Sequence, residues 1–369
     1  MLPSMRYTVL HGAKENCGDF YIRDAAINLL TTLTDVSEKE LHLVEVVRKD
    51  LSESVINTIG KTEIAFLAGG PGYRQNFYPN TYPEMQALLD VTTVVPLGPG
   101  WKGQNEQAYE FTQESVDVLT RITNQPEVPY LGARDLPTVR ILRNHNLSAE
   151  LTGCPGWFYQ GDTPPRPQFT SSGSIQNIIT SSPPQYDVKH LLQWFSLIRS
   201  LEAEFPHADI TLAFHRSESD AAFRPVVDWP TQRSTWENNA AAVIYGLITQ
   251  YAAHHGHEIW DIPADSTYGD RYAETDLHAG YRVHAHIPSL AAGTPSFLLQ
   301  IDGRGTGVSE SLGTPADVRS DIGWNRAIDK LLENITQNLN NGFSDFQMVS
   351  ENIHDSYARM EELITTVVP

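Results

Sequence analysis

The sequence predicts an α/β protein of two domains, and three observations lead to this prediction. Short runs of β-branched and apolar residues alternate along the chain with segments whose apolar residues recur at helical spacing. Some of the apolar runs end in glycines, which is typical of buried parallel strands that lead into a ligand-binding loop. The chain has 369 residues, which is long for one hydrophobic core and favours two.

In the first half, strand and helix patterns alternate without a break from residue 7 to residue 147. The predicted strands cover residues 7–10, 41–50, 64–72, 93–100 and the start of 128–147, and the predicted helices cover 20–35, 51–62, 82–92, 111–125 and the end of 128–147. The run at 64–72 is apolar throughout until its glycines, as expected of a strand buried on both faces.

Between Cys154 and Pro184 the composition shifts toward proline, serine, threonine and glycine, which indicates a domain boundary. We expect an N-terminal domain at 1–160, a linker at 161–185 and a C-terminal domain at 186–320. Residues 321–369 are expected to form amphipathic helices that pack back across both domains.

The second half repeats the alternation. Predicted strands lie within 175–180, 208–219, 257–263 and 296–302, and predicted helices at 186–205, 234–256, 285–293 and within 317–343 and 346–368. Gly256 ends the second of these helices. The Asp-Gly-Arg-Gly sequence at 302–305 is expected to be a turn that closes the last strand.

Composition excludes several classes of function. Hydrophobic residues make up 40% of the chain and charged residues 19%, as in an ordinary soluble protein. We expect no membrane span and no signal sequence. Two cysteines provide no disulfide framework, so a cytoplasmic location is expected. The formal net charge of −19 repels nucleic acids and anionic membranes.

The same negative charge would repel a phosphorylated substrate, so clustered basic residues are informative here. Arg282 and His284 stand two residues apart, just ahead of a helical run of small residues. Ligands of open α/β sheets bind at strand carboxyl ends and helix N-termini, so this stretch is the predicted phosphate site. Arg216 follows a strand of the same half and is a further candidate, although it could also be a solvated loop residue.

Two glycine-containing loops of the first half are further candidates. Asp19 could be the N-cap of the first helix or a substrate contact, and the two roles are compatible. The glycines that end the strand at 64–72 allow close approach of a ligand or form a tight turn. Arg134 and Asp135 are expected to form a local ion pair that caps the following helix.

Other chemistries find little support in the sequence. His254, His255 and His257 lie at a helix end, where histidine is favourable without a metal, and no Cys or carboxylate cluster has ligand spacing around them, so we expect no metal. The nucleophile-elbow, P-loop and complete dinucleotide-binding patterns are absent from the sequence. Cys17 is a weak candidate nucleophile because no histidine neighbours it along the chain.

Residues 281–302, YRVHAHIPSLAAGTPSFLLQID, resemble the signature of the polysaccharide pyruvyltransferase family: Arg-x-His-Ala, an apolar helix, Gly-x-Pro and an apolar strand. Further landmarks similar to those of the family follow its order along the chain, at 16–19 (NCGD), 66–72 (FLAGGPG), 94–100 (VVPLGPG) and 133–138 (ARDLPT). Pro71 stands where a third glycine is usual in the family.

The resemblance implies two Rossmann-like domains that face a cleft, similar to the GT-B glycosyltransferase architecture. It also implies that phosphoenolpyruvate is the donor and a hydroxylated acceptor, such as a sugar, the second substrate. The product would be a cyclic pyruvate ketal, and inorganic phosphate would be released. No cofactor or metal is implied.

Roles for individual residues follow from this reaction. Planar guanidinium groups suit a phosphate and a carboxylate, so the predicted donor-binding residues are Arg216, Arg282 and His284. His284 could protonate the methylene carbon of the donor or only bind its phosphate. Asp19 is the candidate base for the acceptor hydroxyl. The predicted acceptor-binding residues are Asn16, Gly18, Asp19 and Gly70.

Three alternatives stay open at the level of sequence. The same basic residues could bind the diphosphate of a nucleotide sugar in a GT-B-like glycosyltransferase. The acceptor could be a small molecule and not a polysaccharide. A non-catalytic protein could have kept the fold, although the combination of two arginines and a histidine argues against lost chemistry. Self-association is common among such α/β folds, but the sequence shows no interface stripe.

Overall fold

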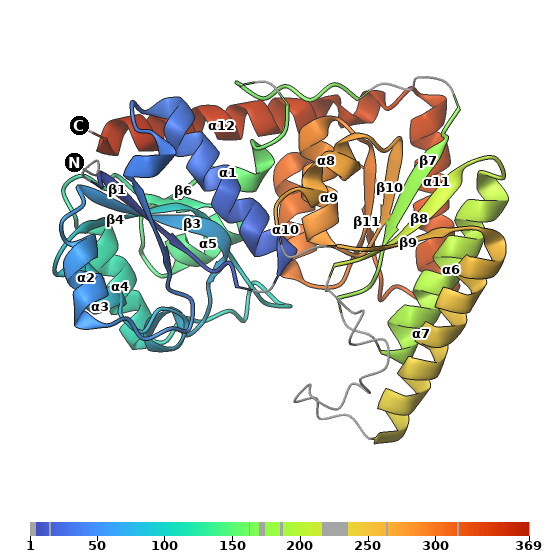
Figure 1. The fold of residues 1–369 in the computed structure, drawn as a ribbon, viewed down its shortest axis with the longest axis horizontal. Coiled ribbons are helices and arrows are strands. Elements are labelled where there is room, and N and C mark those ends of the chain that lie inside the picture. Colours follow the sequence, from blue (N-terminus) through green and yellow to red (C-terminus); the bar gives the residue numbers. More distant parts are fainter. Residues whose placement is uncertain are drawn as a thin grey trace.

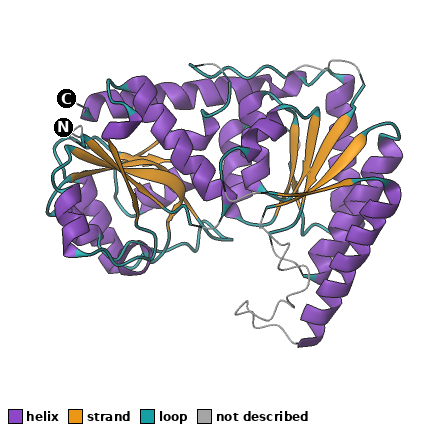
Figure 2. Cartoon of the chain, in the orientation of Figure 1, coloured by secondary structure: helices purple, strands orange, loops and turns teal. Residues whose placement is uncertain are grey.

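The structure, a computed structural model, describes residues 5–14, 16–161, 163–169, 174–184, 187–215, 235–262, 265–315 and 317–368. Two parallel sheets lie side by side, and helices pack around each of them (Figures 1 and 2). The predicted α/β class is therefore confirmed. Among the described residues, none of the helices has the length and apolar composition that a bilayer span requires.

The first sheet has the strand order β2-β1-β3-β4, and every pairing in it is parallel. Its strands are β1 (Tyr7–His11), β2 (Leu41–Glu45), β3 (Ile64–Tyr73) and β4 (Thr93–Trp101), with a short parallel pair, β5 (Leu131–Ala133) and β6 (Ala149–Leu151), beside β4. The helices of this half are α1 (Cys17–Leu33), α2 (Glu53–Ile59), α3 (Met85–Leu89), α4 (Gln113–Thr123) and α5 (Leu136–Asn144).

The second sheet has the order β12-β11-β10-β7-β8-β9 and is also parallel throughout. Its strands are β7 (Asn177–Ser181), β8 (Asp209–Phe214), β9 (Glu258–Asp261), β10 (Leu277–Gly280), β11 (Ser296–Gln300) and β12 (Val318–Arg319). Its helices are α6 (Val188–Glu204), α7 (Thr235–His255), α8 (Tyr268–Ala273), α9 (Val283–Ala292), α10 (Gly303–Leu312) and α11 (Trp324–Asn340).

The last helix, α12 (Gln347–Val367), runs along both halves of the molecule (Figure 1). It contacts α1 of the first half and α10 of the second. The side-chain amide of Asn352 donates to the carbonyl of Leu312 at 3.0 Å, and the guanidinium of Arg359 donates to the carbonyl of Leu151 at 3.4 Å. One helix therefore holds both halves. The domain boundaries predicted from composition stay a prediction.

Several elements differ from the sequence prediction, and strands β6, β10 and β12 and helix α8 are not predicted at all. Helix α1 begins at Cys17, because the side chain of Asn16 and not that of Asp19 accepts the capping hydrogen bond, from the N–H of Gly18. The sequence at 302–305 is not a closing turn: Asp302 caps a helix, α10, that starts at Gly303. The predicted strand at 64–72 is confirmed as β3, which extends one residue further, to Tyr73, with an irregular register after Gly70.

One glycine is required where β4 meets the loop after β6. Gly98 has a φ of +64°, and a Cβ at this position would lie 1.7 Å from the carbonyl oxygen of Gly153. Any side chain would be strained by the backbone angle and would also collide with rigid backbone. The loops at the carboxyl edge of the first sheet therefore depend on this contact.

We expect Gly98→Ala to lower the free energy of unfolding by at least about 2 kcal/mol, since strain and overpacking add. Gly246→Ala is the matched control, because Gly246 lies inside α7 and a Cβ added there would have no heavy atom within 4 Å. It should leave stability unchanged or raise it by up to about 1 kcal/mol. Thermal and urea unfolding measure both variants. Equal stability of the two would contradict the close approach at Gly98.

Candidate active site

Arg282 is held rigidly at the carboxyl end of β10, in the middle of the second sheet. Its backbone N–H donates to the hydroxyl of Ser181 at 3.1 Å. The guanidinium donates to the carbonyl oxygens of Ser182, at 3.1 Å, and Pro183, at 3.0 Å. The side chain is 9% exposed. These bonds fix the plane of a buried cation at the point where α9 begins.

His284 lies in the first turn of α9, and its ring meets the other half of the molecule. A Cβ at Gly18, the second residue of α1, would lie 2.2 Å from both Cγ and Nδ1 of the imidazole. Only glycine allows the α1 backbone to come this close. Burial, together with the positive charges of Arg304 and Arg282, lowers the pKa of His284 to about 3. The ring is therefore neutral near pH 7 in the ligand-free protein.

A cleft of about 430 Å³ opens beside these two residues, with a wall from each half of the chain. The lining residues of the first half are Asn16, Arg48, Lys102 and Gln104, and those of the second half include Arg282, His284, Gln300, Asp302, Arg304 and Gly305. The N-termini of α9 and α10 both reach this cleft. Two helix N-termini at one cavity favour a negatively charged ligand.

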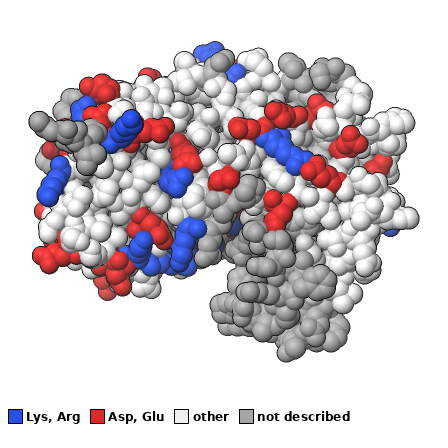
Figure 3. Space-filling model, in the orientation of Figure 1, with Lys and Arg blue, Asp and Glu red and all other residues white. Residues whose placement is uncertain are grey.

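The charged side chains around the cleft are mostly positive. Arg48, Lys102, Arg282 and Arg304 line it together with one acid, Asp302, which pairs with Arg304 at 2.7 Å. Burial lowers the pKa of Lys102, and the neighbouring positive charge of Arg304 lowers it further. Elsewhere acidic side chains are spread over both halves, as Figure 3 shows for one face. In a chain with net charge −19, this local excess of cations marks an anion site.

Asp19 lies next to the cleft and not in its lining. Its side chain borders a small cavity of about 60 Å³ within the first half, together with Arg74 and Tyr82. Burial raises the pKa of Asp19 to about 6, although a hydrogen bond from Asn16 and the charges of Arg304 and other cations oppose the rise. A carboxylate with this pKa can exchange protons near neutral pH.

The other predicted residues of the first half surround His284. Asn16 lines the main cleft. Gly70, with a φ of +87°, shares with Gly18 and His284 a narrow space of about 30 Å³ between the two halves. The structure therefore brings together six of the predicted residues at one interface: Asn16, Gly18, Asp19, Gly70, Arg282 and His284.

Arg216 lies outside the described residues. The residue before it, His215, is buried, and its Nε2 lies 2.7 Å from the hydroxyl of Tyr272. Its Nδ1 lies 3.5 Å from the sulfur of Cys17, so a histidine does neighbour this cysteine in space. Burial nevertheless raises the pKa of Cys17 to about 12. The thiol is protonated and packed between the halves, which argues against a nucleophile.

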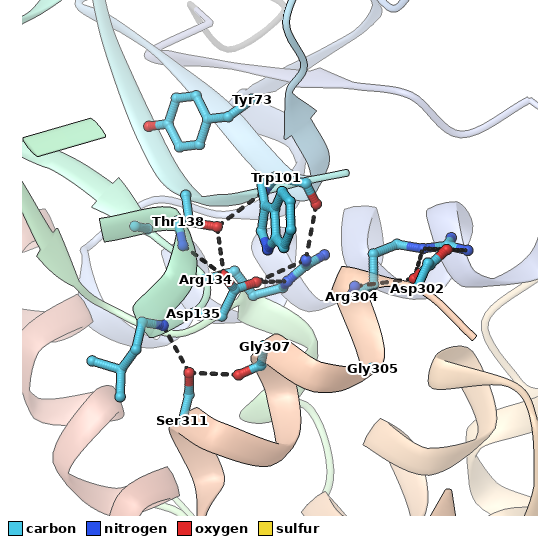
Figure 4. A network of polar contacts seen from close by, with 12 residues as sticks. Tyr73, Trp101, Arg134, Asp135, Thr138, Asp302, Arg304, Gly305, Gly307 and Ser311 are labelled. Atoms are coloured by element: carbon cyan, nitrogen blue, oxygen red, sulfur yellow. Dashed lines mark hydrogen bonds and ion pairs between the residues drawn. The ribbon is translucent and has the colours of Figure 1, made fainter. Parts of the chain in front are cut away.

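A polar network docks α10 on the first half (Figure 4). Arg134 pairs with Asp135 at 2.8 Å, and Asp135 caps α5 by accepting from the N–H of Thr138 at 2.9 Å. The predicted local role of this pair is confirmed. Gly307 of α10 packs on Asp135, where a Cβ would lie 2.8 Å from the carboxyl carbon. The hydroxyl of Ser311 accepts from the N–H of Leu136 at 2.8 Å.

Sequence reasoning missed Arg304, Lys102 and Arg48 as parts of the site. Arg304 carried a signal, since it belongs to the Asp-Gly-Arg-Gly sequence that follows a buried strand. Lys102 and Arg48 follow β4 and β2, but nothing in their local sequence separates them from surface residues. His286, two residues after His284, is a core residue: it is buried, and its Nδ1 lies 2.7 Å from the hydroxyl of Ser296.

Within the described ranges, one group of side chains has the geometry of a metal site: Glu202, His255 and His257. None of the three lines the cleft. The cleft itself presents arginine, lysine, histidine and helix N-termini, which suit an anion and not a cation.

Known structures similar to this one share its architecture. The MnaA–UDP complex of S. aureus matches with a TM-score of 0.57 and 11% identity, over 97% of this chain and 94% of that one. A putative UDP-N-acetylglucosamine 2-epimerase from Listeria monocytogenes gives 0.57 and 9%, over 99% and 96%. A glycosyltransferase from Rickettsia africae gives 0.50 and 10%, over 99% and 96%. At these identities the likeness establishes the fold alone, which is GT-B-like.

A search of curated protein sequences finds no match to this chain. The family model described as polysaccharide pyruvyl transferase matches residues 16–303, which is more than half of the chain. The matched range begins at Asn16 of the α1 cap, ends at Gly303 of the α10 N-terminus, and includes Arg282 and His284. The chain therefore belongs to the polysaccharide pyruvyl transferase family.

Proposed function

We propose that the protein transfers the pyruvyl group of phosphoenolpyruvate to two hydroxyls of a sugar or glycan-like acceptor. The product is a cyclic pyruvate ketal, and phosphate is released. The observation that carries the proposal is the cleft: four cations and one acid surround it, two helices begin at it, and Arg282 and His284, which lie in the range matched by the family model, form part of one wall.

The donor matches this cleft chemically. Phosphoenolpyruvate has a phosphate and a carboxylate, so it needs two anion subsites close together. The fixed guanidinium of Arg282 can bind one of the two anionic groups, the planar carboxylate or the tetrahedral phosphate. The N-termini of α9 and α10, together with Lys102, can bind the other. A volume of about 430 Å³ leaves room for a sugar ring beside so small a donor.

The mechanism assigns two proton transfers to two residues. A bound dianion raises the proton affinity of His284, which then protonates the methylene carbon of the donor and leaves an oxocarbenium-like centre at C2. An acceptor hydroxyl adds to C2 while Asp19 takes its proton. The C2–O bond to phosphate then breaks, the second acceptor hydroxyl adds to C2 and closes the ketal ring, and its proton goes to the departing phosphate, which leaves as inorganic phosphate.

A nucleotide-sugar glycosyltransferase is the second candidate. Similar structures include a complex with UDP and glycosyltransferases, and a cationic cleft also suits a diphosphate. The two candidates differ in their donor, so a direct comparison of phosphoenolpyruvate with UDP-glucose distinguishes them.

Arg282→Ala is expected to weaken phosphoenolpyruvate binding at least about 100-fold, because a buried, pre-oriented charge pair is lost. Arg319→Ala is the control: Arg319 belongs to the same half but is exposed and paired with Asp321. Calorimetric titrations with phosphoenolpyruvate and with UDP-glucose, each with and without a panel of sugar diols, measure the effect. Binding of UDP-glucose in place of phosphoenolpyruvate would overturn the pyruvyl-transfer proposal.

Donor binding should take up a proton at His284. The pKa of the free ring is about 3, so at pH 6.5 the ring is neutral until a dianion raises its pKa. Titrations of phosphoenolpyruvate in two buffers of different ionisation enthalpy give the number of protons taken up. His284→Gln should bind with fewer protons than the wild type. Equal proton counts would exclude His284 as the acid and leave it only a role in binding.

Asp19→Asn is expected to lower kcat about 100-fold or more with little change in the KM for phosphoenolpyruvate, as for loss of a general base. The base must be ionised, and its pKa is about 6. The wild-type rate should therefore fall as pH drops below about 6, and the variant should lose this dependence. Asp24→Asn, at an ion pair with Arg23 on the same helix, is the control. An unchanged acidic limb in Asp19→Asn would assign the base elsewhere.

A further inference from the structure

Three side chains with metal-binding groups meet at the β9 edge of the second sheet, away from the cleft. Glu202 lies in the last turn of α6, His255 ends α7, and His257 precedes β9. The Oε1 atom of Glu202 lies 2.9 Å from Nδ1 of His255 and 2.7 Å from Nε2 of His257. All three ligand atoms lie within 4.8 Å of one another. Glu202 and His257 are 55 residues apart in sequence, so no local spacing could reveal the group.

The local backbone explains why the two histidines converge. Gly256 has a φ of +75°, so the chain turns sharply at the end of α7 and returns His257 to the side of His255. The ring centroids of the two histidines are 6.0 Å apart, and the ring planes are inclined to each other by 27°. The left-handed conformation of Gly256 therefore ends the helix and also places both imidazoles next to the carboxylate of Glu202.

Tyr251 holds the carboxylate and one of the imidazoles in place. Its hydroxyl donates to Oε2 of Glu202, which leaves Oε1 directed at the histidines. Its ring stacks on His255, one turn later in α7, with centroids 3.9 Å apart. Arg199 interacts with the same hydroxyl, and its positive charge lowers the cation affinity that three ligands alone would give. Metal ligands in proteins are commonly oriented by hydrogen bonds from neighbouring groups, and the hydroxyl of Tyr251 provides such a bond to Glu202.

We propose that Glu202, His255 and His257 bind one divalent transition-metal ion, of which zinc fits best, and that the ion ties α6 to the end of α7. Two imidazole nitrogens and one carboxylate oxygen are a ligand set of zinc, and water completes the coordination. Calcium and magnesium prefer oxygen ligands throughout, so they do not fit.

The charge and exposure of the group suit this role. Burial raises the pKa of Glu202, but hydrogen bonds from Tyr251 and His257 outweigh it, so the pKa stays below its ordinary value and the carboxylate is ionised at neutral pH. His255 is exposed and the other two ligands are partly buried, so an ion reaches the group from solvent. Both imidazoles can turn from donating a hydrogen bond to the carboxylate to donating a lone pair to the metal.

The test is zinc binding by metal-free, tag-free protein, measured by competition with a chromophoric chelator, together with the absorption spectrum of the cobalt form. We expect one equivalent per chain. Glu202→Gln and His257→Asn should each weaken binding more than tenfold. Tyr251→Phe, which removes only the orienting hydroxyl, should weaken it about tenfold. His254→Asn is the control, since His254 neighbours His255 on α7 but is not a member of the group.

Thermal unfolding without metal shows that each variant is folded, and zinc should raise the midpoint of the wild type and of His254→Asn more than that of the other variants. Absence of a tight equivalent in the wild type would overturn the proposal. Unchanged affinity in Glu202→Gln and His257→Asn would overturn it equally, because the ion would then bind other histidines. The result is independent of the donor, since none of these residues lines the cleft.

Discussion

The contact between the backbone of Gly18 and the imidazole of His284 is the constraint on which the candidate site depends. The two residues belong to α1 and α9, helices that pack on different sheets, so the contact exists only when the halves are docked. It places Asn16 and Asp19 beside the turn of the second half that carries Arg282 and His284. A second close approach, of Gly307 to Asp135, fixes α10 on the first half and therefore the angle between the cleft walls. Glycine at both contacts lets the two halves approach closely enough for residues of both to line one cleft.

Electrostatics then follows from the docking. Both walls of the cleft carry cationic side chains, although the protein as a whole is strongly acidic. These cations repel one another, and a bound anion would relieve this repulsion. Burial, together with the nearby positive charges of Arg304 and Arg282, lowers the pKa of His284 and keeps the ring neutral. Two effects act in opposite directions on the pKa of Asp19: burial raises it, and the nearby cations lower it. In the proposed mechanism the donor supplies the negative charge that lets His284 act as an acid, which would link donor binding to the protonation state needed for transfer.

Much of this arrangement could be predicted from the sequence, and the exceptions share a cause. The strands at 64–72 and 296–302 and the turn that presents Arg282 and His284 are local patterns, and they appear as β3, β11 and the start of α9. Helix α10 could not be predicted, because its three glycines disfavour helix and are explained only by what α10 packs against. Sequence periodicity also cannot predict contacts between residues that are distant in the chain. The place of Lys102 and Arg48 in the cleft and the grouping of Glu202 with two histidines depend on such contacts.

The burial of Cys17 has a consequence for how the molecule could be observed at work. Its thiol lies on the first half but is shielded by His215 of the second, at 3.5 Å. While the halves are docked, the sulfur is protonated and covered. Separation of the halves would expose it and restore an ordinary thiol. The chain thus contains, at the edge of its cleft, a natural chemical probe whose rate of modification reports how often the two halves come apart.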